Sequence, residues 1–179
     1  ANLSLQQNAG RTRIRGGELG LSWQALDSLA FNGTLGLADS EFLEFCDPTQ
    51  VPLTGNCSVA GNQAPNVPEI TGSLSASHRA ELAANWSLTS TIDYSYMDTR
   101  YDQVGNYAET GDQHRLNAQI SLSTGPLSVA IWGKNLTNDR SASTVVRFFD
   151  PDTGFAFRRA FSVSYPNGLT WGGTVTYRF

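Results

Sequence analysis

The sequence has few charged residues and no long apolar run. Asp, Glu, Lys and Arg together make up 16% of its 179 residues, against about 25% in ordinary soluble domains. No stretch approaches the roughly 20 consecutive apolar residues of a membrane-spanning helix. The formal net charge of −4 argues against nucleic acid as a partner.

Cysteine and histidine are also scarce. Cys46 and Cys57 lie in a stretch rich in Pro, Gly and Asn. We expect them to form one disulfide in an exposed loop, in an oxidising compartment, although two free thiols are the alternative. The two histidines, His78 and His114, fall on different expected strands, so we expect no metal site. No nucleophile elbow, phosphate loop or dinucleotide fingerprint occurs, so no catalytic residue and no cofactor is expected.

What the sequence does contain is alternation, shown best by residues 168–179, G-L-T-W-G-G-T-V-T-Y-R-F. Apolar and aromatic residues occupy every second position, and small or polar residues lie between them, which indicates an extended strand. Its length suits a tilted membrane strand of about 9–11 residues. Trp171 and Tyr177 lie where aromatic girdles would meet the two membrane interfaces. A soluble sheet with its apolar face on a core is the alternative.

The same alternation recurs through the chain and predicts about seven strands. The sixth slips in phase at Asn135 and Leu136, which suggests a bulge. The last is expected to begin near Phe155 and to bend near residues 166–168. The expected strands cover residues 2–25, 29–45, 69–79, 86–96, 115–123, 127–148 and 155–179.

The connections alternate in length. Short turns follow the first, third and fifth expected strands, and long loops follow the second (47–68) and the fourth (102–111). Short periplasmic turns and long extracellular loops are typical of outer-membrane barrels. The predicted fold class is therefore all-β, an antiparallel transmembrane β-barrel. Seven strands alone would leave two open edges in lipid. We therefore expect the C-terminal piece of a larger barrel, with a missing N-terminal portion that is supplied by another chain or has been lost.

Three motifs resemble those of TonB-dependent outer-membrane receptors. Residues 8–18, N-A-G-R-T-R-I-R-G-G-E, resemble the family run N-A-G-x-A-x-x-x-G-x-E, with Thr12 in place of the usual Ala. Residues 129–138, V-A-I-W-G-K-N-L-T-N, resemble the family's penultimate strand. The ending T-V-T-Y-R-F resembles the family's C-terminus. By this resemblance the C-terminal signal for membrane insertion comprises Trp171, Val175, Tyr177 and Phe179.

The resemblance implies a barrel of about 22 strands in the bacterial outer membrane, of which residues 1–179 would form the last seven. It implies an N-terminal plug domain inside the barrel and an energising contact with TonB, both outside this sequence. Lipid and lipopolysaccharide would surround the barrel. The implied function is active uptake of a scarce ligand, namely a ferric siderophore, haem, cobalamin or an oligosaccharide. No bond chemistry is implied, so we expect a protein that is not an enzyme.

Two groups of residues are candidates for ligand binding. Asp93, Arg115 and Trp132 fall on the polar face of their strands, and an arginine cluster surrounds the last long excursion. Arg suits the recognition of carboxylate or phosphate. The alternatives are hydration of the lumen, contact with the plug or the aromatic girdle, and lipopolysaccharide phosphates. The cluster comprises Arg147, Arg158 and Arg159.

Two other classes of function compete with a transport receptor. An outer-membrane enzyme would need a Ser-His or Asp-His pair at one site, but His78 and His114 are expected at opposite ends of the strands. A soluble carbohydrate-binding β-sandwich would be released from cells without detergent.

Overall fold

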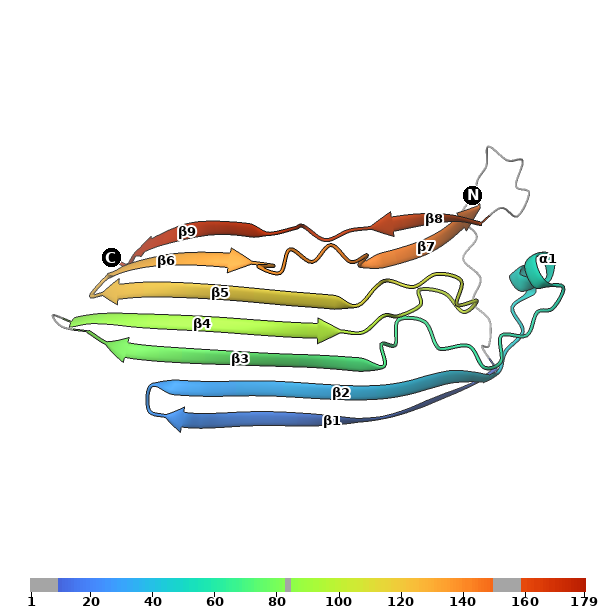
Figure 1. Cartoon of the computed structure of the whole chain (residues 1–179), viewed down its shortest axis with the longest axis horizontal. Helices are drawn as coiled ribbons and strands as arrows, with labels where there is room; N and C mark the ends of the chain where they lie inside the picture. Colours follow the sequence, from blue (N-terminus) through green and yellow to red (C-terminus); the bar gives the residue numbers. More distant parts are fainter. Residues whose placement is uncertain (1–9, 83–84, 150–158) are drawn as a thin grey trace.

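The computed structural model describes residues 10–82, 85–149 and 159–179, without the side chains of residues 53, 148, 149 and 159. Seven strands form one antiparallel sheet, and two more form a separate hairpin (Figure 1). The large sheet runs in the order β1 (Arg11–Leu26), β2 (Leu29–Glu44), β3 (Ile70–Glu81), β4 (Trp86–Met97), β5 (Gln113–Thr124), β6 (Leu127–Lys134) and β9 (Thr170–Tyr177). The hairpin consists of β7 (Thr144–Phe149) and β8 (Arg159–Ser164).

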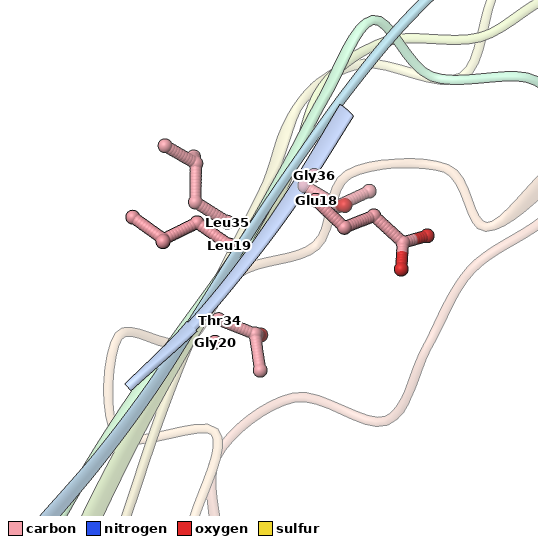
Figure 2. Close-up of a pocket in the computed structure, with 7 residues that line it drawn as sticks. Glu18, Leu19, Gly20, Thr34, Leu35 and Gly36 are labelled. Carbon is pink, nitrogen blue, oxygen red and sulfur yellow. The ribbon is translucent and has the colours of Figure 1, made fainter. Parts of the chain in front are cut away.

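The alternation in the sequence becomes two faces of the sheet. We call the face of Leu19 the outer face and the face of Glu18 the inner face. Figure 2 shows Leu19 and Leu35 on one side of the sheet and Glu18 and Thr34 on the other. Residues that pair across neighbouring strands form rows, and each row lies on one face of the sheet, because the register of pairing fixes which face a side chain occupies. One outer row runs through Leu19, Leu35, Gly72, Tyr96 and His114, and one inner row through Gly20, Thr34, Ser73, Ser95 and Arg115.

The outer face is apolar and uncovered. Leu19 is 67% exposed, Ile131 68% and Trp171 80%. Strands contact mainly the strands with which they pair, and no second layer of the described residues covers this face. The buried apolar side chains instead lie at the ends of strands and in loops, at Phe42, Val59, Ala64 and Val145. This arrangement excludes a self-contained sandwich and fits a barrel wall that faces lipid.

The apolar band has a visible end on β1 and β2. Beyond the Gly17–Leu37 pair the outer face of this strand pair becomes charged, with Arg15 paired to Asp39 in the ladder. One step further, Arg13 Nη2 lies 3.1 Å from Glu41 Oε2. Because charges on a lipid-facing surface are costly, the parts of β1 and β2 nearest the long loops extend beyond the apolar zone.

The predicted asymmetry of the connections is confirmed. Three short turns join β1 to β2, β3 to β4 and β5 to β6 at one end of the sheet (Figure 1). The long loops lie at the other end, and the first of them contains a 3-10 turn (Pro48–Gln50) and α1 (Val51–Thr54). In the described part of the chain, no helix has the length and apolar character needed to cross a membrane.

The predicted sixth strand is two strands, and the predicted bulge is a longer break. β6 ends at Lys134 and β7 begins only at Thr144. Asn135 and Asn138 both have φ of 52°, a left-handed conformation that Asn tolerates better than most residues. The chain therefore turns here instead of absorbing one extra residue.

The last strand also divides, near the predicted bend. β8 ends at Ser164 and β9 begins at Thr170. The expected start of this strand near Phe155 lies outside the described residues.

Candidate functional site

A hollow of about 630 Å³ on the inner face unites two of the predicted binding residues. Asp93 on β4 and Trp132 on β6 both line it. Asp93 Oδ2 accepts a hydrogen bond of 2.5 Å from Asn117 Nδ2 on β5. The hollow thus combines a carboxylate, an amide and an indole, and its remaining lining includes Thr91, Gln119, Lys134 and Thr174.

Trp132 lies against β9 because residue 172 has no side chain. A Cβ on Gly172 would be 2.5 Å from Cζ2 of the indole. The indole Nε1 donates to Thr174 Oγ1 at 3.3 Å, and Lys134 Nζ is 5.4 Å from the ring centroid. The ring is therefore held on the inner wall with a cation beside it, a favourable cation–π arrangement.

Arg115 shares the inner face but does not line this hollow. Its strand position pairs with Ser95, one inner row away from the Asp93–Asn117 pair. Its Nη2 donates to Gln113 Oε1 at 3.1 Å. Asp93 and Arg115 are thus neighbours on one wall, engaged with different partners.

A second inner hollow, of about 510 Å³, surrounds Glu18 (Figure 2). Glu18 lines it with the small residues Gly20, Thr34, Gly36 and Thr71, and Leu19 and Leu35 complete the lining. In the sequence, Glu18 is marked only as the last position of the N-A-G motif and not as a candidate site. The available signal was that Glu18 is the one acidic residue on the inner face of β1.

The arginine cluster is described only in part. The guanidinium carbon of Arg147 on β7 lies 5.7 Å from the centroid of the Tyr107 ring. The carbonyl oxygen of Arg147 accepts from Gln103 Nε2 at 3.3 Å. In the hairpin, residue 159 pairs with Phe149, two positions from the Arg147 pair. Arg158 and the side chain of Arg159 lie outside the described residues.

The predicted disulfide is present in the first long loop. Cys46 and Cys57 are bonded, with their Cα atoms 4.7 Å apart. The backbone N–H of Asp47 donates to the carbonyl of Cys57 at 2.7 Å. The bond therefore closes a compact loop that includes α1.

Asn135 is the centre of a hydrogen-bond network that the sequence pattern does not predict. Its side chain is buried, and Nδ2 donates to the carbonyls of Asp139 at 2.8 Å and Asn167 at 3.0 Å. Its backbone N–H donates to Asn117 Oδ1 at 2.9 Å. The motif thus joins β5, the end of β6 and the segment that leads into β9. Its repeated amides were visible in the sequence, but their partners were not.

Asp139 extends this network. Its carboxylate accepts from the backbone N–H of His114 at 2.6 Å and of Ser141 at 2.7 Å. Burial alone would raise the pKa of Asp139, but hydrogen bonds from Ser141 and His114, with the charge of Arg115, hold that pKa below its usual value. These hydrogen bonds therefore favour the ionised form of the carboxylate.

An Asp-His pair does exist, on the outer face. His114 Nε2 lies 3.0 Å from Asp112 Oδ2, and the Tyr94 hydroxyl lies 2.6 Å from His114 Nδ1. The Tyr96 ring is 4.9 Å from the imidazole, centroid to centroid. These neighbours form an aromatic cluster at the upper end of the apolar band. Within the described residues, no three His, Cys, Asp or Glu side chains gather as a metal site.

Solved structures share the fold. The ferric yersiniabactin uptake receptor FyuA from Yersinia pestis aligns with a TM-score of 0.76 at 17% identity, over 96% of this chain and 24% of that one. The siderophore receptor PiuA from Acinetobacter baumannii aligns with a TM-score of 0.62 at 18% identity, over 92% and 21% of the two chains. BauA, the ferric preacinetobactin receptor of the same organism, gives 0.64 at 17% identity, over 93% and 22%.

The chain spans less than a quarter of each of these receptors. Comparison with curated protein sequences returns no match. A family model described as "TonB dependent receptor-like, beta-barrel" matches residues 1–136. Together with the two-faced sheet and its unequal loops, this match shows that the chain belongs to the TonB-dependent receptor β-barrel family, whose members are outer-membrane transporters and not enzymes.

Proposed function

We propose that this chain is the C-terminal wall of an outer-membrane receptor that takes up a ferric siderophore with energy delivered through TonB. The observation that carries this proposal is the inner face of the sheet, where Asp93, Asn117, Trp132 and Lys134 meet in one hollow. Such a wall offers charged, amide and aromatic groups to a polar ligand. The siderophore receptors that share the fold favour this ligand class over haem, cobalamin or an oligosaccharide.

The rest of the receptor would close the barrel. β1 and β9 are the edge strands of the sheet, and an open edge in lipid leaves backbone groups without partners. Earlier strands would pair with these edges, and a plug domain would fill the lumen. These strands and the plug together make up the N-terminal portion. TonB would act on that portion, and lipid and lipopolysaccharide would contact the outer face.

In the proposed mechanism, this chain binds and guides but changes no covalent bond. The long loops, with Arg147, would capture an anionic ferric complex from outside, because a guanidinium recognises carboxylate and phenolate oxygens well. Asp93, Arg115 and Trp132 would offer weaker contacts along the wall when the plug moves. Arg158 and Arg159 would join Arg147 in the capture.

Uptake by intact cells tests this function. The complete receptor is expressed in a strain that makes no siderophore and lacks its own receptors, and radiolabelled iron is supplied as a panel of ferric complexes. We expect accumulation of one class of complex, abolished when TonB is deleted. Uptake that survives the loss of TonB, or uptake of haem, cobalamin or an oligosaccharide in place of every ferric complex, would contradict the proposal.

A further inference from the structure

We propose that Tyr107 is a positioning residue that holds Arg147 for ligand binding, and that the Cys46–Cys57 disulfide in turn holds Tyr107. This inference rests on the proposed function, because it assigns Arg147 to the capture of an anionic ferric complex. Neither Tyr107 nor the disulfide needs to touch the ligand. They come from separate parts of the chain: β7, the loop between β4 and β5, and the long loop after β2, which all lie at the same end of the sheet (Figure 1).

The first step joins Arg147 to the loop between β4 and β5. The guanidinium lies over the Tyr107 ring, 5.7 Å from its centroid, a distance at which a cation is attracted to an aromatic face. The same loop also binds the backbone of β7 and of the residue before it, because Gln103 Nε2 donates to Arg147 O at 3.3 Å and Arg100 Nη2 donates to Ser143 O at 2.7 Å. The Tyr107 ring therefore limits the directions in which the Arg147 side chain can point.

The second step joins Tyr107 to the first long loop. Its hydroxyl donates to Gln50 Oε1. Gln50 is only 4% exposed, and its Nε2 donates to Asp47 Oδ2 at 2.5 Å. Asp47 is 8% exposed and also accepts from the backbone N–H of Thr49 at 3.0 Å. A buried polar chain with its partners in place favours one geometry, and removing one partner leaves another without a hydrogen bond.

The third step is the disulfide. Cys46 directly precedes Asp47, and the Asp47 N–H donates to the carbonyl of Cys57 at 2.7 Å. The bond closes a loop with a sequence separation of 11, which restricts the conformations open to Asp47 and Gln50. Breaking it frees the residue pair that holds the Tyr107 hydroxyl. Ligand affinity should consequently depend on a bond remote from the ligand.

Binding by the complete receptor in detergent tests the inference. The probes are ferric tris-catecholate, which is anionic, and a neutral ferric tris-hydroxamate, both followed by quenching of intrinsic fluorescence. We expect Tyr107→Leu and the Cys46→Ser, Cys57→Ser double variant to weaken binding of the anionic probe about threefold to tenfold. Tyr107→Phe keeps the ring and should therefore lose less affinity for the anionic probe than Tyr107→Leu. Tyr101→Leu, the same change in the same loop, is the matched control and should bind as the wild type does.

The outcomes separate the two proposals. If Arg147→Gln weakens binding while Tyr107→Leu and the double serine variant bind as the wild type does, the inference is overturned and the proposed function stands. If the wild-type receptor binds neither probe, or if Arg147→Gln changes nothing, the proposed role of Arg147 fails. Backbone hydrogen exchange of residues 100–107 and 144–147 is the independent readout: it should accelerate on reduction of the disulfide, and unchanged exchange overturns the coupling.

Discussion

The indole ring of Trp132 occupies the space in which a side chain at residue 172 would lie. A Cβ at Gly172 would approach the ring to 2.5 Å, whereas a Cβ at the next residue, Gly173, would lie 3.5 Å from the Ala130 carbonyl oxygen. Glycine is thus required at residue 172 by Trp132 on the neighbouring strand, but not at residue 173. Trp132 and β9 hold each other in place on the inner wall.

Gly172→Ala should therefore displace the Trp132 ring and destabilise the seam between β6 and β9. We expect a loss of about 1–3 kcal/mol in the free energy of unfolding, as for overpacking in general. Chemical unfolding of the purified receptor measures the loss. Gly173→Ala is the matched control and should cost clearly less; equal losses from the two variants would refute this account of Gly172.

The two faces can be tested with adjacent residues of β3. Leu74 is 56% exposed on the outer face, and Ser75 lies on the inner face opposite Asp93. Leu74→Lys should cost about 2–4 kcal/mol, because it places a charge against lipid. Ser75→Lys adds the same charge on the inner side and should be tolerated. The yield of folded receptor in outer membranes is the measurement, and a reversed order of the two yields would invert the assignment of the faces.

Asn135 should be among the most sensitive polar residues of this segment. Asn135→Ala removes the donors to Asp139 O and Asn167 O and also places alanine at a φ of 52°. We expect a loss of about 2–4 kcal/mol from the two effects together. Asn135→Gly relieves the backbone strain but not the lost hydrogen bonds, so its thermal unfolding temperature should lie between those of the wild type and Asn135→Ala. An Asn135→Ala receptor as stable as the wild type would show that the network is dispensable.

Acid should weaken the same network through Asp139. The pKa of Asp139 is lowered in the folded protein, so its carboxylate stabilises the fold above the ordinary value of 3.8, and this contribution disappears as pH falls through the lower folded pKa. Near neutral pH the wild type should unfold at a higher temperature than Asp139→Asn. This difference in unfolding temperature should narrow only when the pH falls below the ordinary pKa of 3.8. A gap that does not change with pH would mean that the charge of Asp139 contributes nothing.

The faces and the turns could be predicted from the sequence because both are local. A side-chain period of two assigns Asp93, Arg115 and Trp132 to the inner face without knowledge of their neighbours. The disulfide was also accessible, since Cys46 and Cys57 are the only pair and lie in one loop. Each of these inferences needs only residues that are close in sequence.

The parts that escaped prediction depend on contacts between distant segments. Asn135 breaks the strand because Asn117 and Asn167, far away on either side, supply its partners. The contact between Tyr107 and Gln50 joins two different loops. The sequence places these residues in loops but carries no local sign of which loops meet.

The charged pairs Arg15–Asp39 and Arg13–Glu41 determine which reagents can reach the disulfide. β2 continues to Glu44 after its outer face has become charged, and Cys46 follows only two residues later and is exposed. The loop that the bond closes thus starts from the charged end of β2, which lies outside the hydrocarbon layer. A reductant that cannot cross membranes, added to living cells, should therefore cleave this bond from the medium.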